Sequence, residues 1–292
     1  MTTLAESLEL ATARLTTAGL APSEARQSAW VLAGHVLGQD RASLVAMLRD
    51  ELPAGFASAF DAAAARRASR EPVAYITGRR EFYGRPFIVT RDVLIPRPET
   101  ELVVDESLAC VRSLNGAPGL AIIDVGTGTG CLATTLALEL GAAHVVATDT
   151  SAAALDVARA NAAALGAADR VHFTRGSLVA GTAGPVDLVV SNPPYISDGD
   201  RRRLDPEVGV FEPAGALFAG PDGLDVIRAL APEAARVLRP GGWLVMEIGD
   251  GQADAVRHVI AGTGLLTVER IQPDLQHIPR VVVARRHARK SS

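Results

Sequence analysis

The sequence contains few cysteines, and the two that it has, Cys110 and Cys131, are too few for a disulfide framework or a thiolate zinc site. We therefore interpret both as reduced thiols in the protein core. Long apolar runs are also missing, because no stretch approaches the roughly 20 residues that a helix needs to cross a bilayer. These absences argue against a disulfide-rich secreted protein and against a membrane protein.

The first residues lack the basic stretch and apolar core that mark a secretory signal, and Glu6 and Glu9 stand there instead. The expected location is therefore the cytoplasm. The chain also lacks an excess of positive charge, since its formal net charge is −4. Proteins that bind nucleic acid usually present a basic face, because contacts to phosphates supply much of their affinity. The charge argues against direct binding of nucleic acid, although basic clusters occur at residues 66–70, 79–80, 201–203 and 285–290.

The 292 residues are 48% hydrophobic, which is enough to bury the cores of two domains. Apolar residues recur with helical spacing through residues 1–75, for example at Leu4, Leu8 and Leu15. Gly38 is the expected end of one helix, and Asp40 is the expected N-cap of the next. We interpret residues 1–75 as a small helical bundle without catalytic residues.

Residues 76–97 differ in character, because glycine and proline separate short β-prone pieces at residues 87–89 and 93–95. This pattern predicts a β-hairpin linker. Pro98 suits the first turn of a helix whose positive end would lie near Glu99. We therefore expect a third region, residues 98–292, that begins with a helix.

From residue 119 onward, short apolar runs alternate with alanine-rich helical segments. This alternation is typical of an α/β protein with a mostly parallel, Rossmann-like sheet and helices on both faces. Ligands of such sheets bind at the carboxyl ends of the strands. The runs that predict strands are residues 120–125, 144–148, 171–174, 186–191, 243–248 and 279–284, and the helical segments include residues 151–165, 223–237 and 251–261.

A glycine-rich loop follows the first of these strands. Its spacing, Asp-x-Gly-x-Gly-x-Gly from Asp124 onward, differs from the Gly-x-Gly-x-x-Gly of dinucleotide-binding proteins. A pyrophosphate needs a helix N-terminus close to its charge, whereas S-adenosylmethionine has no phosphate and needs only close backbone approach, which glycine allows. The expected cofactor-binding residues of the loop are Gly126, Thr127, Gly128, Thr129 and Gly130.

Asp149 stands at the end of the second strand, where a carboxylate can accept hydrogen bonds from both ribose hydroxyls. A glycine-rich turn alone is also compatible with a tight strand-to-helix connection or with an NAD site. The acidic residues before and after the loop, together with its glycine spacing, favour S-adenosylmethionine over both alternatives.

A second loop follows the strand at residues 186–190. A planar amide or an aryl amine is a poor nucleophile, and an enzyme must aim its nitrogen at the methyl group. Asn192 offers a carboxamide oxygen that can accept one N–H, and the carbonyl of Pro193 can accept the other. Pro194 stiffens the loop, and Tyr195 can pack flat against a planar substrate group. The loop therefore predicts methyl transfer to a planar NH₂ group.

Several strings of the sequence together resemble the HemK/PrmC family, the bacterial N5-glutamine methyltransferases of peptide chain release factors. The match spans nearly the whole chain, and its most distinctive part is the string Leu-Ile-Pro-Arg-Pro-Glu-Thr-Glu at residues 94–101. The other matching strings are residues 72–78, 81–84, 124–130, 192–195, 211–213, 273–275 and 280–282.

The resemblance implies that residues 126–130 and Asp149 bind S-adenosylmethionine and that residues 192–195 hold the target glutamine, with Asn192 near both. It also implies that the bundle helps to grip a class I release factor while the Gly-Gly-Gln loop of that factor enters the pocket. After the third strand, Gly176 and Ser177 stand where many relatives have an acidic and a bulky residue near the adenine. We therefore expect Ser177 to be a neighbour of the cofactor.

Two other functions remain open from the sequence. An N6-adenine methyltransferase acting on DNA or RNA would use the same Asn-Pro-Pro-Tyr logic on a flipped base. Such enzymes usually add a basic domain, whereas this chain has an alanine-rich bundle. A binding module that kept the fold without activity is the second alternative, and the intact loop at residues 192–195 argues against it.

Overall fold

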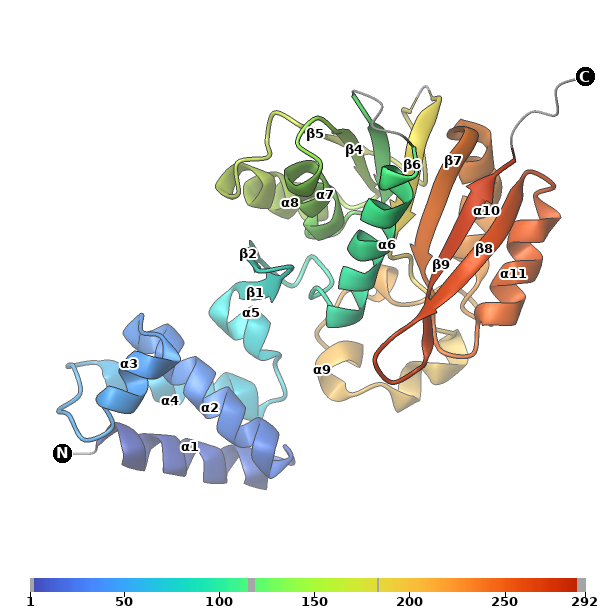
Figure 1. The fold of residues 1–292 in the computed structure, drawn as a ribbon. Helices are drawn as coiled ribbons and strands as arrows, with labels where there is room; N and C mark the ends of the chain where they lie inside the picture. Colours follow the sequence, from blue (N-terminus) through green and yellow to red (C-terminus); the bar gives the residue numbers. More distant parts are fainter. Residues whose placement is uncertain (1–2, 115–118, 183, 288–292) are drawn as a thin grey trace, which may run out of the picture. The chain divides into compact units, whose positions relative to one another are not determined.

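The computed structural model describes residues 3–114, 119–182 and 184–287 of the chain (Figure 1). The chain divides into two compact units, one of Met1–Arg79 with Asp205–Phe211 and the other of Arg80–Leu204 with Glu212–Ser292. Within the described ranges, none of the helices has both the length and the apolar character needed to cross a bilayer.

The first unit is a helical bundle around a main apolar core, which includes Leu4, Leu32 and Phe60, with a smaller cluster at Leu15 and Leu20. The side chain of Thr3 accepts from the backbone of Glu6 and begins the first helix, and Gly38 ends the second at a φ of +63°. The helices are α1 (Leu4–Thr17), α2 (Pro22–Leu37), α3 (Arg41–Ala46), α4 (Phe56–Ala68) and α5 (Val73–Thr77).

A segment from much later in the chain completes this unit, and it contains the short helix α9 (Pro206–Gly209). Arg67 of α4 is buried, and it donates to Glu207 at 2.9 Å and to Glu24 at 2.6 Å. Arg70 donates to the other oxygen of Glu207 at 2.7 Å. Since a buried guanidinium needs carboxylate partners, α9 is part of the bundle's polar core.

A two-stranded hairpin of β1 (Arg79–Phe82) and β2 (Arg85–Ile88) follows, which confirms the predicted hairpin but not both of its pieces. Residues 87–88 belong to β2, whereas residues 93–95 form no strand and the partner strand precedes β2 instead. Tyr83 and Gly84 both have positive φ, +52° and +72°, as a two-residue type I′ turn requires. Asn161 fastens the hairpin, because its side chain exchanges two hydrogen bonds with the backbone of Ile88, at 2.7 and 3.0 Å.

The main sheet of the second unit has seven strands in the order β5-β4-β3-β6-β7-β9-β8. It is mostly parallel, as predicted, and β9 alone runs opposite to the other six strands, so that its pairings with β7 and β8 are both antiparallel. The edge strand β8 is absent from the sequence prediction, because its polar, half-exposed residues carry no apolar run. The strands are β3 (Ala121–Val125), β4 (His144–Asp149), β5 (Val171–Arg175), β6 (Val186–Ser191), β7 (Leu238–Glu247), β8 (Leu266–Pro273) and β9 (Pro279–Arg286).

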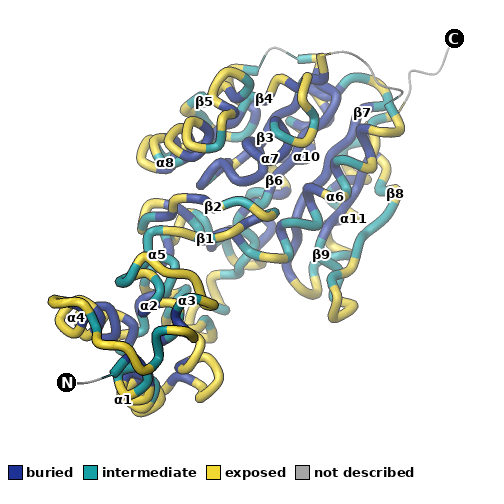
Figure 2. Tube along the Cα trace, turned by 60° about the vertical axis from the view of Figure 1, so that its left-hand side comes forward, coloured by how far each residue is buried: buried dark blue, intermediate teal, exposed yellow. Residues whose placement is uncertain are grey.

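Helices cover both faces of the sheet, and the central strands are buried on each side (Figures 1 and 2). Successive side chains of a strand face opposite ways, so Ile122 packs in one core and Ile123 in the other. The first core includes α6 (Glu101–Arg112), α7 (Cys131–Glu139) and part of α8 (Ala152–Ala164), and the second includes α10 (Asp225–Val237) and α11 (Ala253–Gly262).

The strand order reverses at β3, because the chain proceeds from β3 to β4 and β5 and then returns to β6 on the other side of β3. A crevice forms outside the carboxyl ends of the strands at such a reversal. Val125 at the end of β3 pairs with Ser191 at the end of β6. The two loops singled out in the sequence, which follow these residues, therefore begin side by side.

The central packing predicts the effect of a truncation in β6. Leu188 is fully buried, and Leu188→Ala should lower the free energy of unfolding of this unit by about 2–5 kcal/mol through lost burial and a cavity. Urea unfolding followed by Trp243 fluorescence, in a Trp30→Phe background, measures the change. Leu265→Ala, at a side chain that is 44% exposed, is the control and should stay within about 0.5 kcal/mol. Equal effects of the two substitutions would contradict the prediction.

Candidate active site

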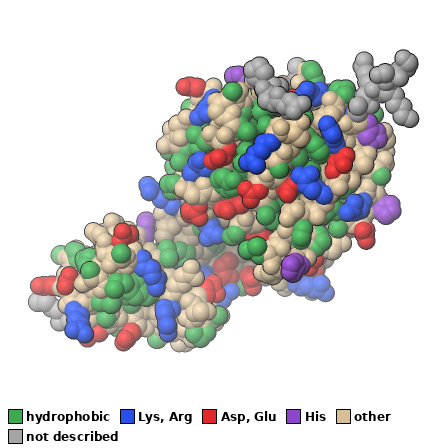
Figure 3. Space-filling model, in the orientation of Figure 1, with side chains coloured by type: hydrophobic (Ala, Val, Ile, Leu, Met, Phe, Trp, Pro, Cys, Tyr) green, Lys and Arg blue, Asp and Glu red, His purple; other side chains and the backbone are tan. Residues whose placement is uncertain are grey.

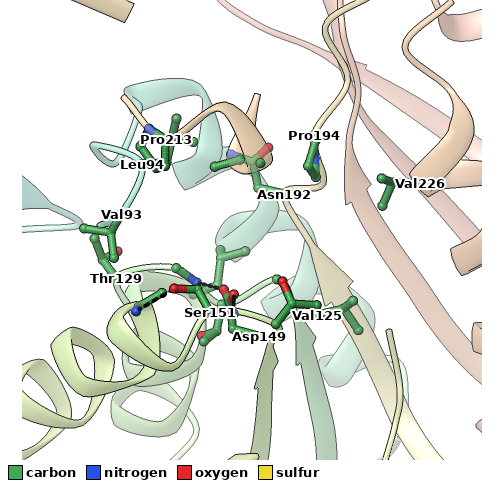
Figure 4. Close-up of a pocket in the computed structure, with 18 of the residues that line it drawn as sticks. Val93, Leu94, Val125, Thr129, Asp149, Ser151, Asn192, Pro194, Pro213 and Val226 are labelled. Atoms are coloured by element: carbon green, nitrogen blue, oxygen red, sulfur yellow. Dashed lines mark hydrogen bonds between the residues drawn. The ribbon is translucent and has the colours of Figure 1, made fainter. Parts of the chain in front are cut away.

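A cavity of about 470 Å³ lies in the second unit, at the carboxyl ends of β3, β4 and β6. Its volume is in the range of small-molecule and cofactor sites. Figure 4 shows Asn192 and Pro194 on one side of the cavity and Asp149 and Ser151 across from them. The wall comes from six parts of the chain: residues 92–100, 125–132, 149–154, 176–178, 192–194 and 213–229.

The glycine-rich loop forms the floor of this cavity, and residues 126–129 all line it. Gly126 and Gly128 have φ values of +72° and +53°, which other residues rarely adopt, and a Cβ at either position would meet open space. Gly130 is different, because its Cβ would lie 3.0 Å from the Cβ of Ala158 on α8. The first two glycines therefore leave room for a ligand, and the third lets two helices approach.

Asp124 supports the loop from below rather than facing the cavity. It is buried, and its Oδ2 accepts from the hydroxyl of Thr127 at 2.6 Å and from the backbone N–H of Ala133, in the first turn of α7, at 3.1 Å. Burial raises the pKa of Asp124 to about 7, against the effect of these two hydrogen bonds, and the charge of Asp149 adds to the rise. The carboxyl group thus joins the glycine loop to the start of the following helix.

Asp149 lies at the cavity wall and orders two backbone segments. Its Oδ2 accepts from the N–H of Gly128 and its Oδ1 from the N–H of Ser151, both at 2.9 Å. A carboxylate oxygen can accept more than one hydrogen bond, so both oxygens still have capacity for a ligand's hydroxyl groups. The side chain is therefore fixed in place and equipped to receive a diol.

The segment after β5 closes the cavity on its far side, where Gly176, Ser177 and Leu178 are all part of the wall. A Cβ at Gly176 would lie 2.8 Å from the Cβ of Ala180, so a larger residue here would require the turn to shift. The carbonyl of Leu178 accepts from the hydroxyl of Thr148 at 2.6 Å. The structure thus explains the glycine at this position and places Ser177 at the cavity.

The loop after β6 contributes Asn192 and Pro194 to the cavity wall, whereas Pro193 is buried beneath it. Ser191 anchors the loop, because its hydroxyl donates to the carbonyl of Val125 at 2.8 Å. Tyr195 is half-buried and does not belong to the cavity wall. The structure therefore brings Asn192 and Pro194 together with the glycine loop and leaves Tyr195 behind them.

A chain of hydrogen bonds leads from Asn192 into the protein. Its Nδ2 donates to the hydroxyl of Thr100 at 3.0 Å, and that hydroxyl donates to Glu247 Oε2 at 2.6 Å. The hydroxyl of Tyr195 donates to Glu247 Oε1 at 3.0 Å. Burial raises the pKa of Glu247 above its ordinary value, and the hydrogen bonds from Thr100 and Tyr195 act against that rise.

The Leu-Ile-Pro-Arg-Pro-Glu-Thr-Glu string has a structural role beyond beginning a helix at its 3₁₀ turn (Pro98–Thr100). Arg97 donates to the buried Glu212, whose other oxygen accepts from the N–H of Ile95 at 3.2 Å. Glu101 accepts from the N–H of Tyr83 at 2.8 Å. The string thus ties the hairpin, the cavity wall and Asn192 to one another.

Sequence reasoning did not select Thr100, Glu212 or Glu247 as parts of the site. Their partners lie more than 90 residues away along the chain, where no local pattern can indicate them. The one available signal was the pair of distinctive strings, residues 94–101 and 211–213, whose polar residues had no separate explanation.

The charge of the cavity wall tests which cofactor fits. Among its described residues are three aspartates, Asp92, Asp149 and Asp225, and no lysine or arginine. Such a wall repels a pyrophosphate, whereas it suits a ligand that carries sulfonium and ammonium charges. The residues present fit S-adenosylmethionine. Fold and site together define a class I, S-adenosylmethionine-dependent methyltransferase.

Comparison with known proteins gives a more specific result. The chain is 46% identical to the release factor glutamine methyltransferase of Cereibacter sphaeroides, over 96% of this chain and 98% of that protein. It is 42% identical to the same enzyme of Bradyrhizobium diazoefficiens, over 94% of this chain and 92% of that protein. The chain belongs to the release factor glutamine methyltransferase family. A model of the PrmC N-terminal domain matches residues 6–78, and one of the methyltransferase small domain matches residues 104–207.

Solved structures share the fold at low sequence identity. The hMettl16 catalytic domain superposes with a TM-score of 0.56 at 16% identity, over 78% of this chain and 82% of that one. A methyltransferase from Pyrococcus furiosus gives a TM-score of 0.50 at 16% identity, over 70% of this chain and 91% of that one. At these identities the likeness concerns the fold alone.

The raised pKa of Asp124 predicts how stability changes with pH. The ordinary value of 3.8 applies in the unfolded chain and about 7 in the folded one, so the native state retains this proton more strongly. The resulting stabilisation is complete below about pH 4 and is lost as the pH rises through 7. The natural protein should therefore lose about 2–3 kcal/mol of unfolding free energy between pH 5 and pH 8 through this group, and Asp124→Asn should abolish that loss.

Urea unfolding of the natural protein and the Asp124→Asn variant across this pH range measures the difference. Asp156→Asn, at a largely exposed carboxylate on α8, is the control and should leave the pH dependence unchanged. A constant difference in stability between the natural protein and Asp124→Asn at every pH would contradict the prediction.

Proposed function

We propose that this protein transfers the methyl group of S-adenosylmethionine to N5 of the glutamine in the Gly-Gly-Gln motif of class I peptide chain release factors. The names of the relatives from C. sphaeroides and B. diazoefficiens support the substrate. The observation that carries the proposed chemistry is the orientation of the Asn192 side-chain amide, because its Nδ2 already donates a hydrogen bond to Thr100. Its Oδ1 is therefore the group offered to an N–H donor at the cavity.

In this proposal the glycine loop and Asp149 hold the cofactor. Gly126 and Gly128 allow close backbone approach, and Asp149 accepts from the ribose hydroxyls. The bound cofactor supplies an electrophilic methyl group on a sulfonium. The residues proposed to contact it are Gly126, Thr127, Gly128, Thr129, Asp149, Ser177 and Asn192, which all line the cavity, whereas Gly130, predicted with them, lies outside the wall and packs against α8.

The same proposal assigns the substrate amide to residues 192–195. Asn192 Oδ1 and the carbonyl of Pro193 accept hydrogen bonds from the two N–H groups of the glutamine side chain. These two hydrogen bonds aim the amide nitrogen at the methyl group and stabilise the positive charge that develops on the nitrogen. Pro194 keeps the turn rigid, whereas Tyr195 lies outside the cavity wall and supports the loop through its hydrogen bond to Glu247 rather than by packing on the amide. No base has to act first, because the nitrogen becomes acidic as the new bond forms.

Removal of the acceptor at Asn192 tests this chemistry. Asn192→Ala should retain cofactor binding and lower the turnover number by about 10²- to 10³-fold, as is usual when one stabilising hydrogen bond of a transition state is lost. Labelled methyl transfer to purified release factor measures turnover, and calorimetry measures cofactor binding. Unchanged turnover would remove the proposed role of Asn192.

A choice of substrates tests which molecule accepts the methyl group. Replacing the glutamine of the Gly-Gly-Gln motif with alanine should abolish labelling of the release factor, and DNA and RNA should take no label. The face in Figure 3 shows basic and acidic side chains interspersed, which gives no continuous track for phosphates. Labelling of nucleic acid in place of the protein would favour the N6-adenine methyltransferase.

We also propose that the bundle, residues 1–75, binds the release factor, that residues 76–97 link it to the catalytic region of residues 98–292, and that the reaction occurs in the cytoplasm. The bundle carries three large apolar side chains that are exposed, and side chains of this kind suit a protein partner. They are Leu10 at 68%, Val45 at 53% and Val31 at 44% exposure.

A charge placed among these exposed apolar side chains should weaken binding of the release factor and leave the methyl-transfer step unchanged. Leu10→Asp should raise the KM for the release factor by about five- to tenfold, the effect of losing a contact worth about 1 kcal/mol, and leave kcat within about twofold. Leu265→Asp is the matched control, because Leu265 is 44% exposed and precedes β8, whose start lies at the sheet edge opposite the cavity. A triple variant at Leu10, Val31 and Val45 with an unchanged KM would contradict the bundle's role.

A further inference from the structure

We infer that Thr100 and Glu247 are positioning residues that fix which end of the Asn192 carboxamide faces the substrate. This inference rests on the proposed function, since it concerns the same amide acceptor. Both residues are buried, Thr100 with 2% and Glu247 with 1% of its surface exposed. They come from separate elements, the 3₁₀ turn before α6 and the last residue of β7.

The two ends of a carboxamide have nearly the same shape, so packing alone cannot decide between them. The hydrogen-bond partners therefore determine which end of the carboxamide faces the cavity. Here they do so in a series that starts at the buried Glu247 and ends at Asn192. Glu247 accepts at both oxygens, from the hydroxyl of Thr100 at 2.6 Å and from that of Tyr195 at 3.0 Å, so the hydroxyl of Thr100 is used as a donor. The oxygen of Thr100 is then left as an acceptor, and it can bind only the NH₂ end of Asn192, at 3.0 Å.

The direction of this chain decides what the substrate meets. With Nδ2 turned inward, Oδ1 is the end of Asn192 available at the cavity, where it can accept an N–H of the glutamine. With the amide reversed, two N–H donors would face the donors of the substrate, and the nitrogen would be pushed out of line. The series of hydrogen bonds from Glu247 through Thr100 to Asn192, here called the relay, therefore presents Oδ1 of Asn192 as an acceptor at the reaction site.

Other groups around Glu247 fit this role. Tyr195 donates to its second oxygen at 3.0 Å, so both ends of the catalytic loop are held by one carboxylate. Burial raises the pKa of Glu247 and the charge of Glu99 adds to the rise, while the two hydroxyl hydrogen bonds and the charge of Arg280 act against it. The opposing reading is that Glu247 is only a buried polar group satisfied by two hydroxyl groups, and an experiment on the full chain can separate the two.

The experiment compares four single variants in methyl transfer to release factor. Thr100→Val keeps the shape and removes the relay oxygen, and Glu247→Gln adds a donor where only an acceptor stood. Each should lower kcat by about 10- to 100-fold and leave the KM for S-adenosylmethionine within about threefold. Thr100→Ser restores a hydroxyl and should keep kcat within about threefold of the natural protein.

Asp187→Asn is the matched control for burial of a changed carboxylate. Asp187 lies at the start of β6, at the opposite edge of the sheet, where it accepts from the N–H of Ala121 at 2.8 Å and pairs with Arg239. It should keep the natural kcat even if it lowers stability. The double variant Thr100→Val with Glu247→Gln should lose no more activity than Thr100→Val alone, because both changes break one relay.

Natural kcat in Thr100→Val or in Glu247→Gln would overturn the inference, as would an equal loss in Asp187→Asn or a multiplicative loss in the double variant. Binding of S-adenosylmethionine, measured by calorimetry, shows that each variant is folded. The Asn192→Ala variant distinguishes the two levels. If Asn192→Ala keeps full turnover, the proposed function of Asn192 fails. If Asn192→Ala loses turnover while the Thr100 and Glu247 variants keep it, only the relay is refuted.

Discussion

The pairing of Val125 with Ser191 across two adjacent parallel strands is the constraint on which the rest of the site depends. The glycine loop begins directly after Val125, and the second loop begins directly after Ser191. The register of this one pair of strands therefore places the glycine loop beside Asn192. The hydroxyl of Ser191 strengthens this pairing through its bond to the carbonyl of Val125. A slip of one residue would turn every side chain of β6 to the other face and separate the two loops.

Three buried carboxyl groups then fix the loops that the sheet has brought together. Asp124 holds the glycine loop, Glu212 holds the wall that contains Ile95, and Glu247 holds Thr100 and Tyr195. Burial raises the pKa of each, and this cost is met by several hydrogen bonds at every position. Carboxylates suit the purpose because they accept from several donors at once, and they therefore set the direction of neighbouring hydroxyl and amide groups.

Local pattern was sufficient for the parts of the fold that repeat locally. The apolar runs predicted six strands of the main sheet, and the alternation with helices predicted its parallel order. Local pattern missed β8, whose edge position allows polar residues. It also missed the contacts of Thr100 with Glu247, Arg97 with Glu212 and Arg67 with Glu207, because each joins residues more than 100 positions apart. Such pairs follow from the topology of the sheet and the bundle and leave no period in the sequence.

The acceptor proposed at Asn192 does not by itself distinguish an amide from the amino group of a base, since both present two coplanar N–H bonds. Selection between them has to come from the surroundings. A flipped base would bring its phosphates to a cavity wall that carries three aspartates and no described cation, whereas a loop with two glycines brings a neutral backbone. The same charges that suit a cationic cofactor therefore repel phosphate groups, so one electrostatic feature supports both the cofactor and the proposed protein substrate.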